Sequence, residues 1–106
     1  MSLDRLSEFD ARPGAGDVVD GELAVTDDVL VKAFALGPGA TVEPHEHAES
    51  TNVFHVVEGT VVVIQDDEES QVRAPGVVLN ERGQAHGLRN GSDERAVVTA
   101  SLCPLP

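Results

Sequence analysis

The segment GATVEPHEHAESTNVFHVVEG, residues 39–59, carries the strongest structural signal in the chain. One residue separates His45 from His47, and residues two apart in an extended segment share a face. Both imidazoles are therefore expected to point toward one place while Glu46 points away. Neutral imidazole is the commonest metal ligand in proteins. His86 can supply a third imidazole, because closed β architectures bring strands that are distant in sequence beside each other across the interior.

Short valine-rich segments separated by turn residues extend from this segment in both directions. This pattern is typical of an all-β sandwich or barrel. Because 106 residues leave no room for a second fold, we expect an N-terminal tail at residues 1–16 and one barrel domain at residues 17–106. The expected strands are residues 23–25, 29–36, 41–43, 52–58, 60–65, 71–74, 77–79, 87–90 and 95–102.

Two shorter segments, one near the N-terminus and one acidic, carry weaker structural signals. Leu3, Leu6 and Phe9 recur at every third position, which suits one or two helical turns or a tail that packs its apolar anchors. The acidic run at residues 66–69 is expected to lie in a solvated hairpin loop that extends to Ser70, because like charges crowd there.

Composition narrows the classes of function. The 19 acidic and 7 basic residues give a net charge of −12, so nucleic-acid backbones and anionic membrane surfaces would be repelled. Such an acidic, lysine-poor composition resembles that of halophilic proteins, in which salt screens self-repulsion. With three Phe and neither Tyr nor Trp, the core is expected to consist of Val, Leu, Ala and Ile.

The expected location is the cytoplasm. Cys103 is the one cysteine, so an intrachain disulfide cannot form, and a reducing compartment fits. The longest apolar runs, such as residues 61–64, fall far short of the roughly 20 residues that a membrane helix needs.

Two motifs in this sequence resemble those of the cupin superfamily, specifically a small single-domain cupin of the cupin 2 type. The first family motif reads G-x5-H-x-H-x3/4-E-x6-G, and its positions correspond here to Gly39, His45, His47, Asn52 and Gly59. Asn52 therefore stands where the family has glutamate. The second motif reads G-x5-P-x-G-x2-H-x3-N, and its second half matches GQAHGLRN at residues 83–90. Its first half departs from the family, because Gly76 lies one residue too close and Glu81 replaces the proline.

The resemblance implies a jelly-roll-like conserved β-barrel that holds one divalent metal ion between its sheets. His45, His47 and His86 would be ligands, and Asn52 would occupy the position of the fourth. An asparagine amide is neutral and a weaker donor than a carboxylate. Selectivity is then expected to move from manganese toward zinc, iron, nickel or copper. Asn52 could instead complete a hydrogen-bond network, and Glu49 is another candidate carboxylate.

Cupins of this size include dioxygenases and isomerases, so the resemblance implies a metal-dependent enzyme acting on a small organic molecule. The alternative is a non-catalytic module that binds or senses a small ligand, because the motifs contain no obvious acid–base pair. The expected walls of the pocket are Phe54, Val56, Leu88, Val98 and Ala100. Arg89, beside the second motif, is expected to face away from His86.

A homodimer is expected from the apolar character of two strands on both of their faces. Residues 61–64 and 77–79 lack the polar alternation of a strand with one face in water. The second face must then be covered by another sheet or by another chain. The resemblance to small cupins, which commonly dimerise through such a face, implies the second chain, to which Val53, His55 and Val57 would contribute.

Overall fold

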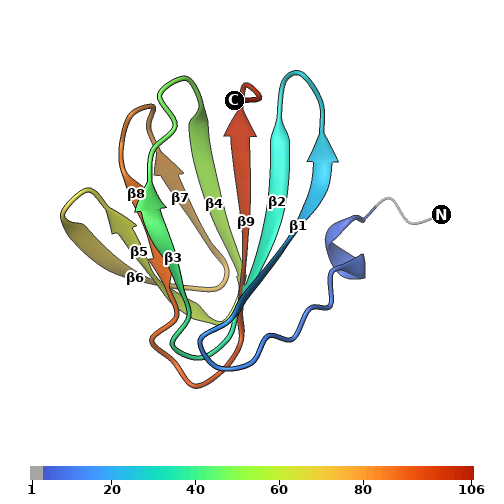
Figure 1. Ribbon diagram of the computed structural model, residues 1–106, viewed down its shortest axis with the longest axis vertical. Helices are drawn as coiled ribbons and strands as arrows, with labels where there is room; N and C mark the ends of the chain where they lie inside the picture. Colours follow the sequence, from blue (N-terminus) through green and yellow to red (C-terminus); the bar gives the residue numbers. More distant parts are fainter. Residues whose placement is uncertain (1–3) are drawn as a thin grey trace.

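The computed structural model describes residues 4–106, which form nine strands in two antiparallel sheets (Figure 1). One sheet has the order β1-β2-β9-β4-β7 and the other β3-β8-β5-β6. The all-β prediction is therefore confirmed. The elements are η1 (Leu6–Glu8), β1 (Val18–Val25), β2 (Leu30–Leu36), β3 (Thr41–His45), β4 (Thr51–Glu58), β5 (Thr60–Gln65), β6 (Glu68–Arg73), β7 (Gly76–Asn80), β8 (His86–Arg89) and β9 (Ala96–Cys103).

The core lies between the two sheets and follows from the period-two pattern of the strands. In β4, Phe54 and Val56 are buried while His55 between them is exposed. Val61 and Val63 of β5 are buried in the same way from the opposite sheet. The core cluster is built from Leu, Ala and Val, as the composition predicts, together with Phe54, whereas the predicted isoleucine, Ile64, is only half-buried.

The first strand is longer than the predicted residues 23–25. It begins at Val18, which pairs with Leu36 of β2, and the pairing continues to Val25 opposite Leu30. Asp20 and Glu22 interrupt the apolar pattern, so the sequence conceals this part of the strand. The structure compensates one of these charges, because the Lys32 ammonium of β2 lies 2.7 Å from an Asp20 carboxylate oxygen.

The predicted loop from Asp66 to Ser70 is wrong at its C-terminal end. Only Asp66 and Asp67 form the turn between β5 and β6, since Gln65 already pairs with Glu68. Asp66 adopts a φ of 50°, which aspartate tolerates better than most residues. Strand pairing thus outweighs charge repulsion here, and Glu69 is neutralised by Arg89 at 2.7 Å.

The N-terminal segment packs beside the five-stranded sheet (Figure 1). The Phe9 ring lies against Gly21 of β1, and the Arg95 guanidinium donates to the Ala11 carbonyl oxygen at 2.7 Å. The three-residue helix η1 agrees with the expected helical turn, while Leu3 lies outside the described residues. Within residues 4–106 no helix has both the length and the apolar character needed to cross a bilayer.

Candidate metal centre

The two sheets spread apart at the end where β3 and β9 finish and β4 and β8 begin, which is the top of Figure 1. His45 is the last residue of β3 and pairs with His86, the first residue of β8. His47 lies two residues beyond the end of β3. His45 and His47 are therefore not both within one strand, contrary to what their spacing suggests. One ring nitrogen from each histidine lies within 4.8 Å of the other two. The structure therefore brings all three predicted histidines together.

Two of the three rings are oriented by backbone carbonyl groups. His45 Nδ1 lies 2.9 Å from the Glu43 carbonyl oxygen, and His86 Nδ1 lies 3.0 Å from that of Gln84. Because a carbonyl oxygen can only accept, each Nδ1 carries the proton and each Nε2 keeps its lone pair. A backbone acceptor on the second ring nitrogen is the usual way in which a metal-binding histidine is oriented.

The environment favours the neutral form of two of the three histidines. Burial lowers the pKa of His86, which a hydrogen bond to the Gln84 carbonyl opposes and the nearby His45 and His47 reinforce. Burial also lowers the pKa of His47, as does the proximity of His45. Both shifts favour the neutral form of His47 and His86, in which a ring nitrogen keeps the lone pair that would bind a metal ion.

This donor set fits a divalent ion. Three neutral imidazoles leave a coordination position open for water or substrate, as in catalytic zinc sites. Nitrogens bound at about 2.0–2.1 Å to one tetrahedral ion are about 3.4 Å apart, so an ion would draw these rings closer than the present 4.8 Å limit. His45 is exposed at the cavity mouth, which leaves it room to move.

Asn52 lies next to the histidines at the start of β4 and is only 2% exposed. Its Nδ2 is 3.1 Å from His86 Nε2, and its Oδ1 accepts a 3.4 Å hydrogen bond from Asn80 Nδ2. Gln65 Nε2 in turn donates to Asn80 Oδ1 at 2.8 Å. The residue at the expected fourth ligand position is thus part of a chain of side-chain amides, which is buried at Asn52 and Asn80 and reaches the half-buried Gln65.

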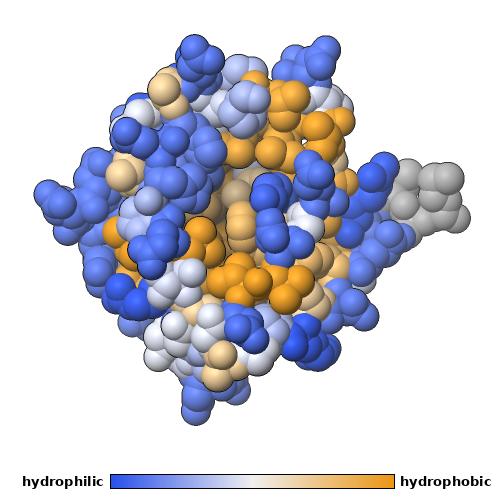
Figure 2. Space-filling view, viewed as in Figure 1, coloured by the Kyte–Doolittle hydropathy of each residue, from blue (hydrophilic) through white to orange (hydrophobic). Residues whose placement is uncertain are grey.

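A cavity of about 200 Å³ opens beside the cluster. Figure 2 shows apolar side chains gathered over β2 and β9 around a hollow, with hydrophilic side chains on the β3 side. Phe54, Leu88 and Ala100 line the cavity as predicted, whereas Val56 and Val98 are not among its lining residues. The lining residues are Leu30, Lys32, Phe34, Val42, His45, His47, Asn52, Phe54, Leu88, Ala100, Leu102 and Pro106.

Several lining residues were not predicted from the sequence, and among them Lys32 is the charged one. It shares a face of β2 with Phe34 and Leu36, so simple alternation could have placed it inward. Its ammonium pairs with Asp20 and lies 5.3 Å from the centre of the Phe34 ring.

Other candidates lie elsewhere. Glu46 and Glu49 are exposed and do not line the cavity, and His55 is exposed on the opposite face of β4.

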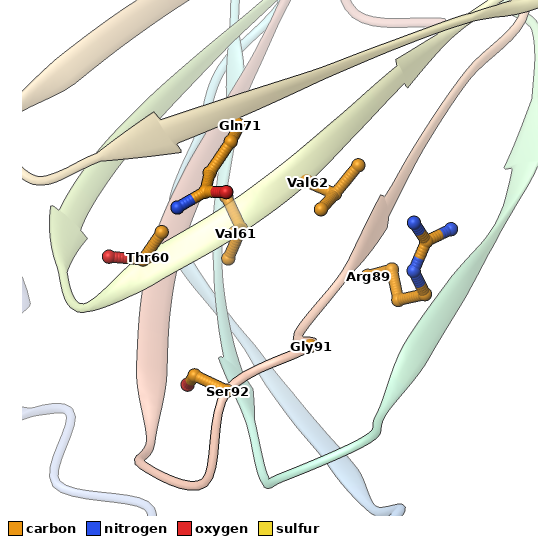
Figure 3. A pocket seen from close by; sticks show the side chains of 7 residues that line it. All are labelled: Thr60, Val61, Val62, Gln71, Arg89, Gly91 and Ser92. Atoms are coloured by element: carbon orange, nitrogen blue, oxygen red, sulfur yellow. The ribbon is translucent and has the colours of Figure 1, made fainter.

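A larger hollow of about 440 Å³ lies over β5, β6 and the end of β8 (Figure 3). Its one cation, Arg89, faces away from the histidines as expected and forms a two-bond pair with Glu69 at 2.7 and 3.2 Å.

Comparisons with known proteins agree on one fold. The family model described as the cupin domain matches residues 32–103. The chain is 31% identical over 70 residues to the tetracenomycin polyketide synthase protein TcmJ of Streptomyces glaucescens, a match covering 66% of this chain and 47% of that protein. It therefore spans about half the length of this curated relative.

Solved structures resemble the whole chain. The TT1209 protein of Thermus thermophilus superposes with a TM-score of 0.89 and 27% identity over 100% of both chains. A conserved protein with a double-stranded β-helix domain from Klebsiella pneumoniae gives a TM-score of 0.85 and 20% identity, covering 97% of this chain and 89% of the other.

Proposed function

The chain belongs to the cupin family, and from that premise we propose that it is a metal-dependent enzyme that acts on a small organic molecule. The observation that carries the proposal is the group of three ring nitrogens within 4.8 Å at the head of an apolar cavity. A bound divalent ion such as zinc, iron, nickel, copper or manganese would supply a Lewis acid and, for the redox-active metals, an electron-transfer centre.

The side chains around the cluster have separate tasks. The Glu43 and Gln84 carbonyl oxygens hold two of the imidazoles in the orientation that exposes Nε2. Phe54 and Leu88 present apolar surface that keeps bulk water from a ligand in the cavity. Together these groups would hold a metal ion and orient a small molecule beside it.

The lining favours dioxygenase-type over isomerase-type chemistry. Isomerisation beside a carbonyl needs a general base within hydrogen-bond reach of the proton that moves. Of the described residues that line the cavity, none is Asp or Glu, and Lys32 is already paired with Asp20. The same lack of an acid–base group favours the second candidate, a cupin that binds a small ligand without turnover.

Elemental analysis tests the metal site. The wild-type protein is loaded in turn with each of the five metals, freed of excess ion and measured for metal per chain. We expect close to one ion per chain in the wild type and in His55→Gln, and a loss in His45→Gln and His86→Gln. His45 is exposed, so its variant avoids the risk that replacing the buried His86 unfolds the protein. Equal metal content in all four proteins would overturn the assignment.

Oxygen uptake separates the two candidate functions. The metal-loaded protein is supplied with diketones, flavonols, thiols and uronates, with His45→Gln as the control. Metal-dependent consumption of oxygen or substrate supports the enzyme, whereas binding of one of these compounds without turnover supports the module.

We also propose that the protein forms a homodimer through the outer face of β4 and β7. Val77 and Leu79 are 68% and 55% exposed, on β7, which lies beside β4 at the edge of the five-stranded sheet within residues 4–106. Val53 pairs with Leu79, and His55 pairs with Val77, so these side chains form one surface. Sedimentation equilibrium should give a dimer for the wild type and a monomer for the double variant Val77→Lys, Leu79→Lys. A wild-type monomer would refute the proposal.

A further inference from the structure

A chain of amide groups runs through the wall behind the histidines, and its direction is fixed at one end by the backbone. Gln65 Nε2 donates to the Leu79 carbonyl oxygen at 2.9 Å and to Asn80 Oδ1 at 2.8 Å. Asn80 Nδ2 donates to Asn52 Oδ1 at 3.4 Å, and Asn52 Nδ2 lies 3.1 Å from His86 Nε2. We call Gln65, Asn80 and Asn52 the amide relay.

Each link determines the next. The Leu79 carbonyl oxygen can only accept, so Gln65 must present its NH2 group there, and the same NH2 group requires an acceptor on Asn80. Asn80 then has its NH2 group left for Asn52, which must offer its oxygen. The relay therefore turns the NH2 group of Asn52 toward the histidines. The other end agrees, because His86 carries its proton on Nδ1 and can accept at Nε2.

This direction changes the role of Asn52. To offer Oδ1 to a metal ion, Asn52 would have to rotate by half a turn, and Asn80 and Gln65 would have to follow. Gln65 would then bring its oxygen against the Leu79 carbonyl oxygen, and the hydrogen bond there would be lost. If an ion took the lone pair of His86 Nε2, the Asn52 NH2 group would lose that acceptor and could donate to a ligand bound next to His86. N–H donors at that place favour a negatively charged oxygen atom.

A positively charged group, the Lys32 ammonium, lines the same cavity. Lys32 is the only lysine of the chain, and its ion-pair partner Asp20 on β1 is not among the lining residues, so a carboxylate in the cavity would share the ammonium with Asp20. The described lining residues include neither Asp nor Glu although the chain carries 19 acidic residues. The rest of the lining is mainly apolar. A cavity of about 150 Å³ admits benzene, so the 200 Å³ found here suits a molecule of about that size with one charged group.

We propose that Asn52 is a hydrogen-bond donor to the ligand, held in that role by the relay, and that with Lys32 it makes the cavity a site for a small organic carboxylate with an apolar body. This inference rests on the proposed function in placing the carboxylate at the open position of a metal ion. The donor direction and Lys32 belong to the chain itself, so they act on an anion in metal-free protein as well. Gln65 and Asn80 are positioning residues.

Calorimetric titration with benzoate and its neutral isostere benzamide tests the ligand class. Zinc-loaded and metal-free wild-type protein should each bind benzoate at least about tenfold more tightly than benzamide, because a hydrogen bond to a charged group accounts for such a factor. Lys32→Met keeps the apolar stem and should lose this preference without weakening benzamide binding. Equal affinities for the two probes in the wild type would overturn the inference.

Asn52→Asp tests the donor role, since aspartate has nearly the same shape but only accepts. We expect zinc affinity, measured by competition with a chelating dye, to rise at least about tenfold and benzoate affinity to fall by a similar factor. Opposite changes of the two affinities distinguish the proposal from structural damage, which would weaken both. Benzoate affinity that stays unchanged or rises while zinc affinity rises would show that Asn52 acts through its oxygen, and it would overturn the donor role.

Gln65→Glu tests the relay at a distance from the metal site. A carboxylate offers only acceptors, so Asn80 must turn its NH2 group toward it, and Asn52 must then turn its oxygen toward the histidines. Zinc affinity should rise and benzoate affinity should fall, as in Asn52→Asp. Gln65→Met removes the anchor without reversing the direction and should change both affinities less. Identical values for the two Gln65 variants would overturn the relay.

The failure of this inference and that of the proposed function are separable. If the protein binds none of the metals, the proposed metal site fails, while the preference of metal-free protein for benzoate over benzamide still decides the ligand class. If zinc binds but the protein binds benzoate no more tightly than benzamide, the metal site stands and the carboxylate inference fails.

Discussion

Replacing Gly87 with alanine is expected to damage both the fold and the metal site, because β3 approaches β8 more closely there than a side chain permits. A Cβ atom on Gly87 would lie 2.7 Å from the Val42 carbonyl oxygen, 2.9 Å from Pro44 N and 3.0 Å from Pro44 Cα. All three are backbone atoms, so no side-chain rotation relieves the contact. His45 follows Pro44 directly and pairs with His86, next to Gly87.

The expected magnitude follows from these distances. Restoring an ordinary contact of at least 3.4 Å requires β3 to move by about 0.7 Å. Overpacking of this kind costs about 1–3 kcal/mol, and we expect about 2–3 kcal/mol because the obstructing atoms are backbone. The same shift separates His45 from His86, so zinc affinity should fall by at least about tenfold.

Gly39→Ala is the matched control. Gly39 has a φ of 76°, and a Cβ atom there meets nothing within 4 Å. The left-handed conformation costs an alanine about 1–2 kcal/mol, of which the stiffer unfolded chain returns about 0.4–1 kcal/mol. Urea unfolding of metal-free protein and zinc competition are measured for both variants. Equal urea midpoints would refute the steric argument, and an unchanged zinc affinity in a destabilised Gly87→Ala would show that β3 does not set the position of His45.

Three further predictions concern charge. Metal-free protein should lose stability as the pH falls below 6.5, because the lowered pKa values of His47 and His86 mean that the unfolded chain binds more protons there, and His47→Gln should flatten the urea midpoint against pH. The hydrogen bond from Arg95 lowers the pKa of Glu58, so its stabilisation is present above pH 4.5 and disappears as the pH falls through the lowered value. Glu58→Gln should therefore cost up to about 1 kcal/mol at pH 7, since the pair is partly exposed, and nothing at strongly acid pH. With a net charge of −12, the thermal midpoint should rise from about 0.1 M to about 2 M KCl, and a flat response would contradict the halophilic interpretation.

The strands and the histidine cluster could be predicted because both depend on short-range patterns. Alternation in β4 places Phe54 inward and His55 outward from the sequence alone. The spacing of His45 and His47 keeps the two rings close together although His47 lies beyond the end of β3, and the resemblance of the segment around His86 supplies the third ring. The exact ends of the strands were harder to predict from the sequence. Glu68, for example, belongs to β6 because it pairs with Gln65 of β5.

The direction of the Asn52 amide could not be predicted, because it depends on groups in two other strands. Gln65 belongs to β5 and Asn80 to β7, and only the folded structure places them in a line that ends at His86. The sequence shows an amide in place of a carboxylate but not which of its two polar atoms faces the site. The place of Lys32 in the cavity, by contrast, could have been predicted, because Lys32 alternates with Phe34 along β2. It was not predicted because a charged residue is expected to face water.

Repulsion by the net negative charge and attraction by the cavity lining act on an anionic ligand over different distances. Repulsion from the net charge of −12 extends only about 8 Å beyond the surface in physiological salt, whereas the Asn52 amide acts at hydrogen-bond distance in a less polar medium. The surface charge should therefore govern how fast benzoate arrives, and the lining should govern how long it stays. Raising the salt concentration from about 0.01 M to about 0.15 M, which shortens the screening length from about 30 Å to about 8 Å, should speed association in stopped-flow measurements and leave dissociation nearly unchanged. Slower association at the higher salt would mean that the field at the mouth is positive, so that the Lys32 ammonium outweighs the surface charge there.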